Sequence, residues 1–262
     1  MSNTTISKIQ NTKKYELTNE TIDFDSHKLY RIRALRDFDD VKAGQLGGYI
    51  ESESNLSHDG KCWLYDDAMI FQNARVFENA KIRNNAYVII GAKVYGNALV
   101  SGQAWIACDK ARVYDNAVIN GNAKIGGCVS GNAVVSDNAV ISQGAHAYEN
   151  ARVYDQARVC GFVYGNAHVY GKTHIHIFAS VYDNAHVFCS AHIHDFARVY
   201  GNAKISGSAR IGCGSQVFDN AQIYGKAKTA WHVKIYGNAV LKENMKFSED
   251  VCDADQDVNK AA

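Results

Sequence analysis

The chain has 262 residues, with 28 Lys and Arg against 27 Asp and Glu and a net charge of +1. This balance argues against a protein that grips nucleic acid, because binding a phosphate backbone needs a large positive surplus. Hydrophobic residues make up 47% of the chain, which excludes a disordered protein, and no stretch approaches the roughly 18 consecutive apolar residues of a membrane span. We therefore expect a soluble, folded protein with no membrane or nucleic-acid partner.

The chain begins with a polar and basic segment, residues 1–14, which lacks the apolar core of a signal peptide. We predict that this segment is disordered and that the protein is not exported. The seven cysteines are scattered, with no CxxC pair among them, which favours a reducing compartment over a disulfide framework. The predicted location is the cytoplasm.

Residues 15–49 form the next predicted element. Residues 28–35 alternate between polar and apolar side chains, as a half-buried strand does, and the turn-rich residues 37–49 follow. An uncovered end of a repeat protein exposes unpaired backbone groups and invites other chains to stack on it. We predict a small β cap over residues 15–49.

A six-residue repeat then runs from Ala68 to Met245, with units such as AKVYGN. A small Ala and a β-branched Val or Ile lie two residues apart, which is the period of a strand with both side chains on one face. The next two positions are Gly, Asp or Asn, which tolerate the left-handed conformations of a sharp corner. Such short strands cannot bury an inner face alone, so we predict a coil of stacked strands over residues 50–245.

Three hexads make one turn of 18 residues, with one residue added near Asp109 and two missing in each of the stretches 123–132 and 157–166. Stepping by turns reaches an asparagine every time: Asn79, Asn97, Asn116, Asn132, Asn150, Asn166, Asn184, Asn202, Asn220 and Asn238. The residue before it alternates between an acid and glycine, which doubles the carboxylate spacing to ~9.6 Å. We predict a ladder of asparagine amides and about 11 turns, stacked ~4.8 Å apart.

These hexads resemble those of the hexapeptide-repeat proteins, whose fold is a single-stranded, left-handed parallel β-helix. The resemblance implies an all-β triangular solenoid; its left hand comes from the resemblance alone, because crossover connections generally favour the right hand. The segment DFDDVKAGQLGGYIESESNLSHDGKCWLYDDA is also similar to the opening module of poorly characterised bacterial and phage hexapeptide proteins that are named as transferases. We expect residues 246–262 to form an acidic C-terminal tail.

The strongest chemical signal is a histidine block. THIHIF and AHIHDF lie 18 residues apart, so one pair of histidines stacks on the other. The candidate metal ligands are His174, His176, His192 and His194, and the candidate catalytic residues are His174 and His192. A vertical spacing of ~4.8 Å lets two imidazole nitrogens converge on one zinc ion, which needs one or two further ligands. The alternative is a surface ladder of stacked rings.

Two enzyme activities follow only from the resemblance. Gamma-type carbonic anhydrases of this family bind zinc through three histidines at a subunit interface, but their supporting Arg and Gln-Asp pattern is not evident here. Acyltransferases of the family use trimers, an interface histidine and a loop that leaves the coil, whereas this coil has no excursion longer than one residue. Zinc and coenzyme A therefore stay open as cofactors, and the residues predict neither.

A column of outward aromatic rings is the largest feature, flanked by a partly basic column. The predicted partner-binding residues are Tyr95, Tyr114, Tyr148, Tyr164, Tyr182, Tyr200, Phe218, Tyr236, Arg112 and Arg198. Tyrosine with arginine is the composition favoured at protein interfaces. The alternative is a stacking ladder that only stiffens the coil.

We favour a non-enzymatic scaffold or binding protein that self-associates as a dimer or trimer through this flat aromatic and basic face. The phage-like opening module suggests, by resemblance, a phage or prophage accessory role in which the face engages a host protein. The competing hypothesis is an enzyme, either an acyltransferase or a zinc-dependent enzyme that uses the histidine block.

Overall fold

The computed structural model describes residues 13–242 and 244–252. These residues fold as β-strands joined by tight corners, and their one helical segment is the 3-10 turn η1 (Glu53–Asn55). Within the described part, no helix has the length and apolar character needed to cross a membrane. The chain divides into two compact units, residues 1–121 and 122–262.

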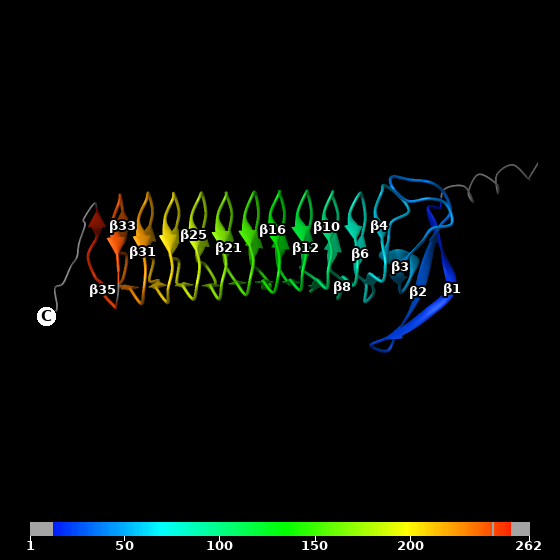
Figure 1. Ribbon diagram of the computed structural model, residues 1–262. Coiled ribbons are helices and arrows are strands. Elements are labelled where there is room, and N and C mark those ends of the chain that lie inside the picture. The colour runs from blue at the N-terminus through cyan, green and yellow to red at the C-terminus, as the bar shows by residue number, and fades with distance from the viewer. Residues whose placement is uncertain (1–12, 243, 253–262) are drawn as a thin grey trace, which may run out of the picture. The chain divides into compact units, whose positions relative to one another are not determined.

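The first unit begins with an antiparallel cap of β1 (Tyr15–Phe24), β2 (His27–Ala34) and β3 (Leu46–Ile50). Strand β3 then pairs in parallel with β5 (Met69–Ile70), so the cap continues into the first sheet of the coil (Figure 1). Leu29 and Tyr49 of the cap pack with Phe71 and Ile89 of the coil. The cap is thus built onto the coil by both hydrogen bonds and apolar contacts.

The coil of the first unit has three parallel sheets, because each turn adds one strand to each sheet. Sheet 1 holds β5, β8 (Tyr87–Ile89) and β11 (Trp105–Ala107). Sheet 2 holds β6 (Arg75–Val76), β9 (Lys93–Val94) and β12 (Arg112–Val113). Sheet 3 holds β4 (Trp63–Leu64), β7 (Lys81–Ile82), β10 (Leu99–Val100) and β13 (Val118–Ile119).

The second unit repeats this arrangement. Sheet 1 holds β14 (Lys124–Ile125), β17 (Val140–Ile141), β20 (Arg158–Val159), β23 (His174–Ile175), β26 (His192–Ile193), β29 (Arg210–Ile211), β32 (Lys228–Thr229) and β35 (Lys246–Phe247). Sheet 2 holds β15 (Cys128–Val129), β18 (His146–Ala147), β21 (Phe162–Val163), β24 (Ser180–Val181), β27 (Arg198–Val199), β30 (Gln216–Val217), β33 (Lys234–Tyr236) and β36 (Val251–Cys252). Sheet 3 holds β16 (Val134–Val135), β19 (Arg152–Val153), β22 (His168–Val169), β25 (His186–Val187), β28 (Lys204–Ile205), β31 (Gln222–Ile223) and β34 (Val240–Leu241).

The fold is therefore a β-solenoid, with about 11 turns counted over the two units, as the hexads predict. Inward Ala, Val and Ile side chains are buried, as Val181 and Ala185 illustrate. The predicted faults in the period are confirmed, since the step between stacked asparagines is 19 residues at Asn97 and 16 residues at Asn122 and Asn150. The left-handed sense of the coil stays a prediction from the resemblance.

The predicted asparagine ladder forms within each unit. Eight of the ten side-chain amides donate to the amide oxygen of the asparagine one turn along, at 3.0–3.2 Å. The acid that alternates with glycine has a second role besides charge spacing. Asp183 accepts a hydrogen bond from the backbone N–H of Gly201 at 3.1 Å, and Glu78 accepts one from Gly96 at 2.9 Å. A Cβ on Gly96 would lie 2.7 Å from the backbone nitrogen of Asp115, so the position favours glycine.

The ends of the coil differ from the predicted boundaries. Residues 246–252, expected to belong to an acidic tail, instead add β35 and β36 to sheets 1 and 2. Phe247 is buried, because it continues the inward apolar column of sheet 1. Lys14, placed in the disordered N-terminus by the sequence, is fully buried, and its Nζ donates to the carbonyl of Cys62 at 2.8 Å. Lys13 is described and exposed, whereas residues 1–12 and 253–262 of the predicted segment and tail lie outside the described residues.

Candidate functional site

The histidine block lies on the outer face of sheet 1 in the second unit. His174 and His192 begin β23 and β26 and pair directly across the ladder. His176 and His194 follow two residues later, after an isoleucine that points into the core. Because side chains alternate along a strand, all four imidazoles face outward, as predicted.

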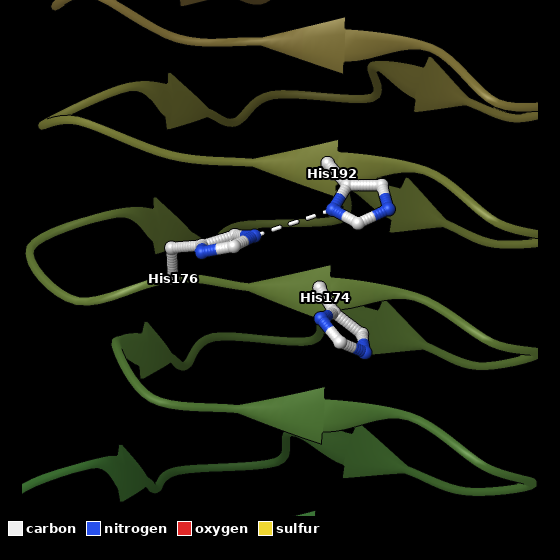
Figure 2. Close-up of side chains that lie close together, drawn as sticks. All are labelled: His174, His176 and His192. Carbon is white, nitrogen blue, oxygen red and sulfur yellow. Dashed lines mark hydrogen bonds between the residues drawn. The ribbon is translucent and has the colours of Figure 1, made fainter.

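The structure brings three of the four imidazoles together. One ring nitrogen from each of His174, His176 and His192 lies within 4.8 Å of the other two. Nε2 of His176 is 3.2 Å from Nδ1 of His192 (Figure 2). We call these three residues the histidine cluster; both candidate catalytic residues, His174 and His192, belong to it.

The fourth predicted ligand, His194, is not one of the three converging residues, although its ring meets the ring of His176 edge-on with centroids 6.0 Å apart. Its Nδ1 is 2.7 Å from a carboxylate oxygen of Asp195. Its ring occupies the space above Gly212 in the next turn, where a Cβ would approach the imidazole to 2.0 Å. The ring of His194 is therefore paired with Asp195 and fills the space that Gly212, which has no side chain, leaves open.

The surroundings of the cluster favour neutral imidazoles. Burial lowers the pKa of His174, and the charge of Arg158 in the turn before lowers it further. Burial also lowers the pKa of His192, with smaller effects from His174, His176 and Arg210. For His176, burial and the neighbouring imidazoles lower the pKa, whereas a carboxylate nearby opposes them. Neutral rings keep a lone pair for a metal ion or a proton.

A cleft of about 380 Å³ borders His174 and was not predicted from the sequence. It is lined by Asn138, Gln156, Arg158, Lys172 and His174. Arg158 and Lys172 give it two positive charges, which suit an anionic group. A sequence signal existed, because Lys172 lies one shortened turn of 16 residues after Gln156, and His174 lies the same distance after Arg158. The prediction did not combine Lys172 and Arg158 into one anionic site.

The predicted aromatic column forms ring stacks in both units. In the first unit Phe77, Tyr95 and Tyr114 stack with centroids 4.8–5.0 Å apart. In the second unit one continuous stack of six rings has centroids 4.8–5.2 Å apart and planes within 8° of parallel. Its members are Tyr148, Tyr164, Tyr182, Tyr200, Phe218 and Tyr236, and we call it the six-ring stack. Each of the six side chains is partly exposed.

The two arginines predicted beside the rings differ in their surroundings. Arg112 donates hydrogen bonds to the backbone carbonyls of Asp109 and Ala111 at 2.7 and 2.8 Å, so its guanidinium is held against the corner. Arg198, on β27, is exposed and lies between Ser180 and Gln216 in the ladder. Arg198 is therefore the more accessible of the two guanidinium groups.

The prediction missed an apolar corner of the second unit. Phe178 and Phe196 stack with centroids 4.8 Å apart and are exposed, as are Ile177 and Trp231. Most other corner positions at positive φ hold Gly, Asp, Asn or Glu. The available sequence signal was a phenylalanine at the same corner of two successive turns, Phe178 and Phe196. Both residues have a positive φ in the structure.

The fold and these surfaces define a β-solenoid of hexapeptide repeats, and two comparisons with known proteins agree with this class. A model of the YdcK beta solenoid repeat matches residues 111–127. The chain is also similar to a protein of Escherichia coli (strain K12) named "Uncharacterized acetyltransferase YdcK", with 38% identity over 66 residues. That match covers 22% of this chain and 20% of the relative.

The matches confirm the resemblance to hexapeptide-repeat proteins that are named as transferases. The chain spans about a fifth of the length of the curated relative it matches. Residues 111–127 contain neither the histidine cluster nor the six-ring stack. The relative's name thus informs this chain's activity only as a proposal.

Proposed function

We propose that this chain is a non-enzymatic binding protein that self-associates through the outer face of sheet 2 in its second unit. The observation that carries the proposal is the six-ring stack. Each of the four inner rings is held between two parallel neighbours, so its conformation is set before any partner arrives. Pre-ordered side chains lose little entropy on binding, which is why rigid aromatic residues favour interfaces.

The phenols of Tyr164 and Tyr182 offer hydrogen-bond donors at neutral pH, whereas the hydroxyl of Tyr200 already donates to Gln216 at 3.1 Å. Burial raises the pKa of Tyr164 and Tyr200, and it raises the pKa of Tyr182 to about 12. These groups therefore stay protonated under ordinary conditions. An interface over them would combine apolar ring edges with O–H donors, as interface cores commonly do.

Charge on the two sides of the six-ring stack supports self-association. His146, Arg198 and Lys234 begin strands of sheet 2 on one side, and Asp183 and Asp219 lie at the corner on the other. A two-fold axis parallel to the stack would place the basic side of one copy against the acidic side of the other. Two-fold interfaces need this self-complementarity. A host protein, which the phage-like opening module suggests, would engage the same face.

The test is the mass of the full-length protein in solution, measured by light scattering during gel filtration. We expect a dimer for the unmodified protein and a monomer for the triple variant Tyr164→Ser, Tyr182→Ser, Tyr200→Ser. A matched control is Tyr154→Ser with Tyr170→Ser, which removes a stacked pair from sheet 3. The control should remain a dimer. A monomeric unmodified protein, or a triple variant that keeps its mass, would exclude the proposed interface.

Acyl transfer is the second candidate function, favoured by the cleft beside His174. Arg158 and Lys172 would hold the phosphates of coenzyme A, and neutral His174 would accept a proton from the acceptor's hydroxyl or amine as it attacks the thioester carbon. The coenzyme A thiolate would leave. Isothermal titration with acetyl-coenzyme A should detect binding that Arg158→Ala weakens at least about tenfold and Arg152→Ala, on sheet 3, leaves unchanged. Equal binding by both variants would count against this activity.

A further inference from the structure

The histidine cluster meets the first geometric requirement of a metal site, which is convergence of several ligand atoms. In a tetrahedral zinc site the nitrogen ligands lie about 2.0–2.1 Å from the ion, so they lie a little over 3 Å from one another. The nitrogens of His176 and His192 are already 3.2 Å apart. His174 lies one turn before His192, with ring centroids 5.1 Å apart. Side-chain rotation alone can bring its nitrogen to the same point, because all three ligand atoms lie within 4.8 Å.

The backbone that holds the three rings is rigid. The backbone N–H groups of His174, His176 and His192 donate to the next turn at 2.8–2.9 Å. Strands β23 and β26 lie inside sheet 1, between β20 and β29. A site on ordered strands keeps its ligands in place better than a site on loops.

The ligand chemistry selects the kind of ion. Three imidazoles and no carboxylate suit Zn²⁺, Cu²⁺ or Ni²⁺ and offer nothing to Ca²⁺ or Mg²⁺, which prefer oxygen. Positive charges on either side, Arg158 and Arg210, oppose a cation and limit the affinity. Asp195 lies near the cluster but is paired with His194.

We propose that His174, His176 and His192 bind one divalent transition-metal ion of the zinc type, with water completing a tetrahedral shell. The site lies on sheet 1 and the proposed interface lies on sheet 2, so neither proposal depends on the other. Three histidines with an open fourth position leave the ion accessible to a small ligand.

The experiment uses full-length protein without an affinity tag, stripped with a chelator and dialysed against Zn²⁺ or Co²⁺. We expect one ion per chain by native mass spectrometry and, with Co²⁺, the visible absorption bands of a four-coordinate ion. Changes outside the ligand shell already weaken metal binding by about 10–100-fold, so His174→Ala, His176→Ala and His192→Ala should each weaken it by at least that factor. Far-UV circular dichroism checks that each variant is folded.

The chain provides a matched control in His168 and His186. These residues form a stacked imidazole pair on sheet 3, with centroids 4.8 Å apart and planes 13° from parallel. Among the described residues, no third imidazole converges with this pair. His186→Ala should leave the stoichiometry and the Co²⁺ spectrum unchanged. Failure of the unmodified protein to retain an ion, or equal losses in His186→Ala and His192→Ala, would overturn the proposal. His194→Ala should retain the ion, which separates the three-histidine site from the four-histidine array.

Discussion

The same outward column of sheet 1 is buried beneath the cap in the first unit and partly exposed in the second. Phe71 and Ile89 in the first unit and His176 in the second each follow the inward residue of a sheet 1 strand. Phe71 and Ile89 are buried beneath the cap, where they pack with Leu29, whereas His176 is partly exposed. The hexad therefore determines only that a side chain points outward. Whether that position becomes core or site depends on what packs over it.

Outward positions of sheet 3 near the cap show the same principle with polar groups. Tyr65 donates a hydrogen bond to Asp40 of the cap, and Lys81 and Arg83 bond the same carboxylate at 3.1 and 3.3 Å. In the second unit, His168 and His186 of sheet 3 stack on each other instead. The first unit uses these positions to attach the cap, and the second leaves them for other roles.

The largest expected effect comes from removing a covered ring. Phe71→Ala should destabilise the protein by about 3–5 kcal/mol, because it leaves a cavity under the cap. His176→Ala, at the equivalent position, should cost less than about 1 kcal/mol, because its ring is partly in solvent. Urea unfolding of both variants measures the difference. Similar losses of unfolding free energy in Phe71→Ala and His176→Ala would show that covered and exposed outward positions do not differ in their contribution to stability.

A smaller loss is expected for Lys14→Ala. The buried ammonium donates to the carbonyl of Cys62 and lies 5.2 Å from the ring centroid of Phe38. Burial lowers the pKa of Lys14 and raises that of the Cys62 thiol. Removing the donor leaves a buried carbonyl without this partner, which costs about 1–3 kcal/mol. Lys13→Ala, which loses only an exposed ion pair with Glu53, is the control and should change the urea midpoint little.

The asparagine ladder should contribute equally in the two units. Asn97→Ala and Asn184→Ala each remove a side chain that both donates and accepts one ladder bond. The net loss expected for each is about 1–2 kcal/mol. Thermal unfolding compares the two variants. A loss confined to one of them would show that the corners of the two units are not equivalent.

The smallest expected effect is a pH dependence that belongs to the cap. The hydrogen bond from Tyr65, with help from Lys81, lowers the pKa of Asp40 to about 2, below its usual value of 3.8. Stability from this ionised group is therefore present above pH 3.8 and is lost as the pH falls toward 2. Because the carboxylate is largely exposed, its ionisation contributes about 1 kcal/mol or less to the free energy of unfolding.

Asp40→Asn provides the measurement for this effect. The variant should be less stable than the unmodified protein at pH 6, and the gap in urea midpoint should narrow between pH 4 and 2. Asp23→Asn, at an exposed position of β1, serves as the control. A gap that stays constant over this range would contradict the assigned role of Asp40.

Much of the coil was predictable because its information is local and repeated. Alternation of Ala with Val or Ile predicts short strands, and the asparagine positions reveal even the three irregular turns. The alignment of His174 with His192 follows from the same arithmetic. The convergence of His176 with His192 does not, because it depends on how each ring turns. The position of the His194 ring does not follow either, because the ring pairs with Asp195 at a corner and fills the space over Gly212 in the following turn.

The sequence by itself determined the period, the inward core, the asparagine ladder and the stacking of like side chains, since each follows from alternation along a strand and a fixed step between turns. Only the tertiary structure decided that Phe71 is covered, that three imidazoles rather than four converge, and that Arg158 and Lys172 border a cleft beside His174. These outcomes depend on side-chain rotation and on packing between segments far apart in the chain, which no repeat in the sequence encodes.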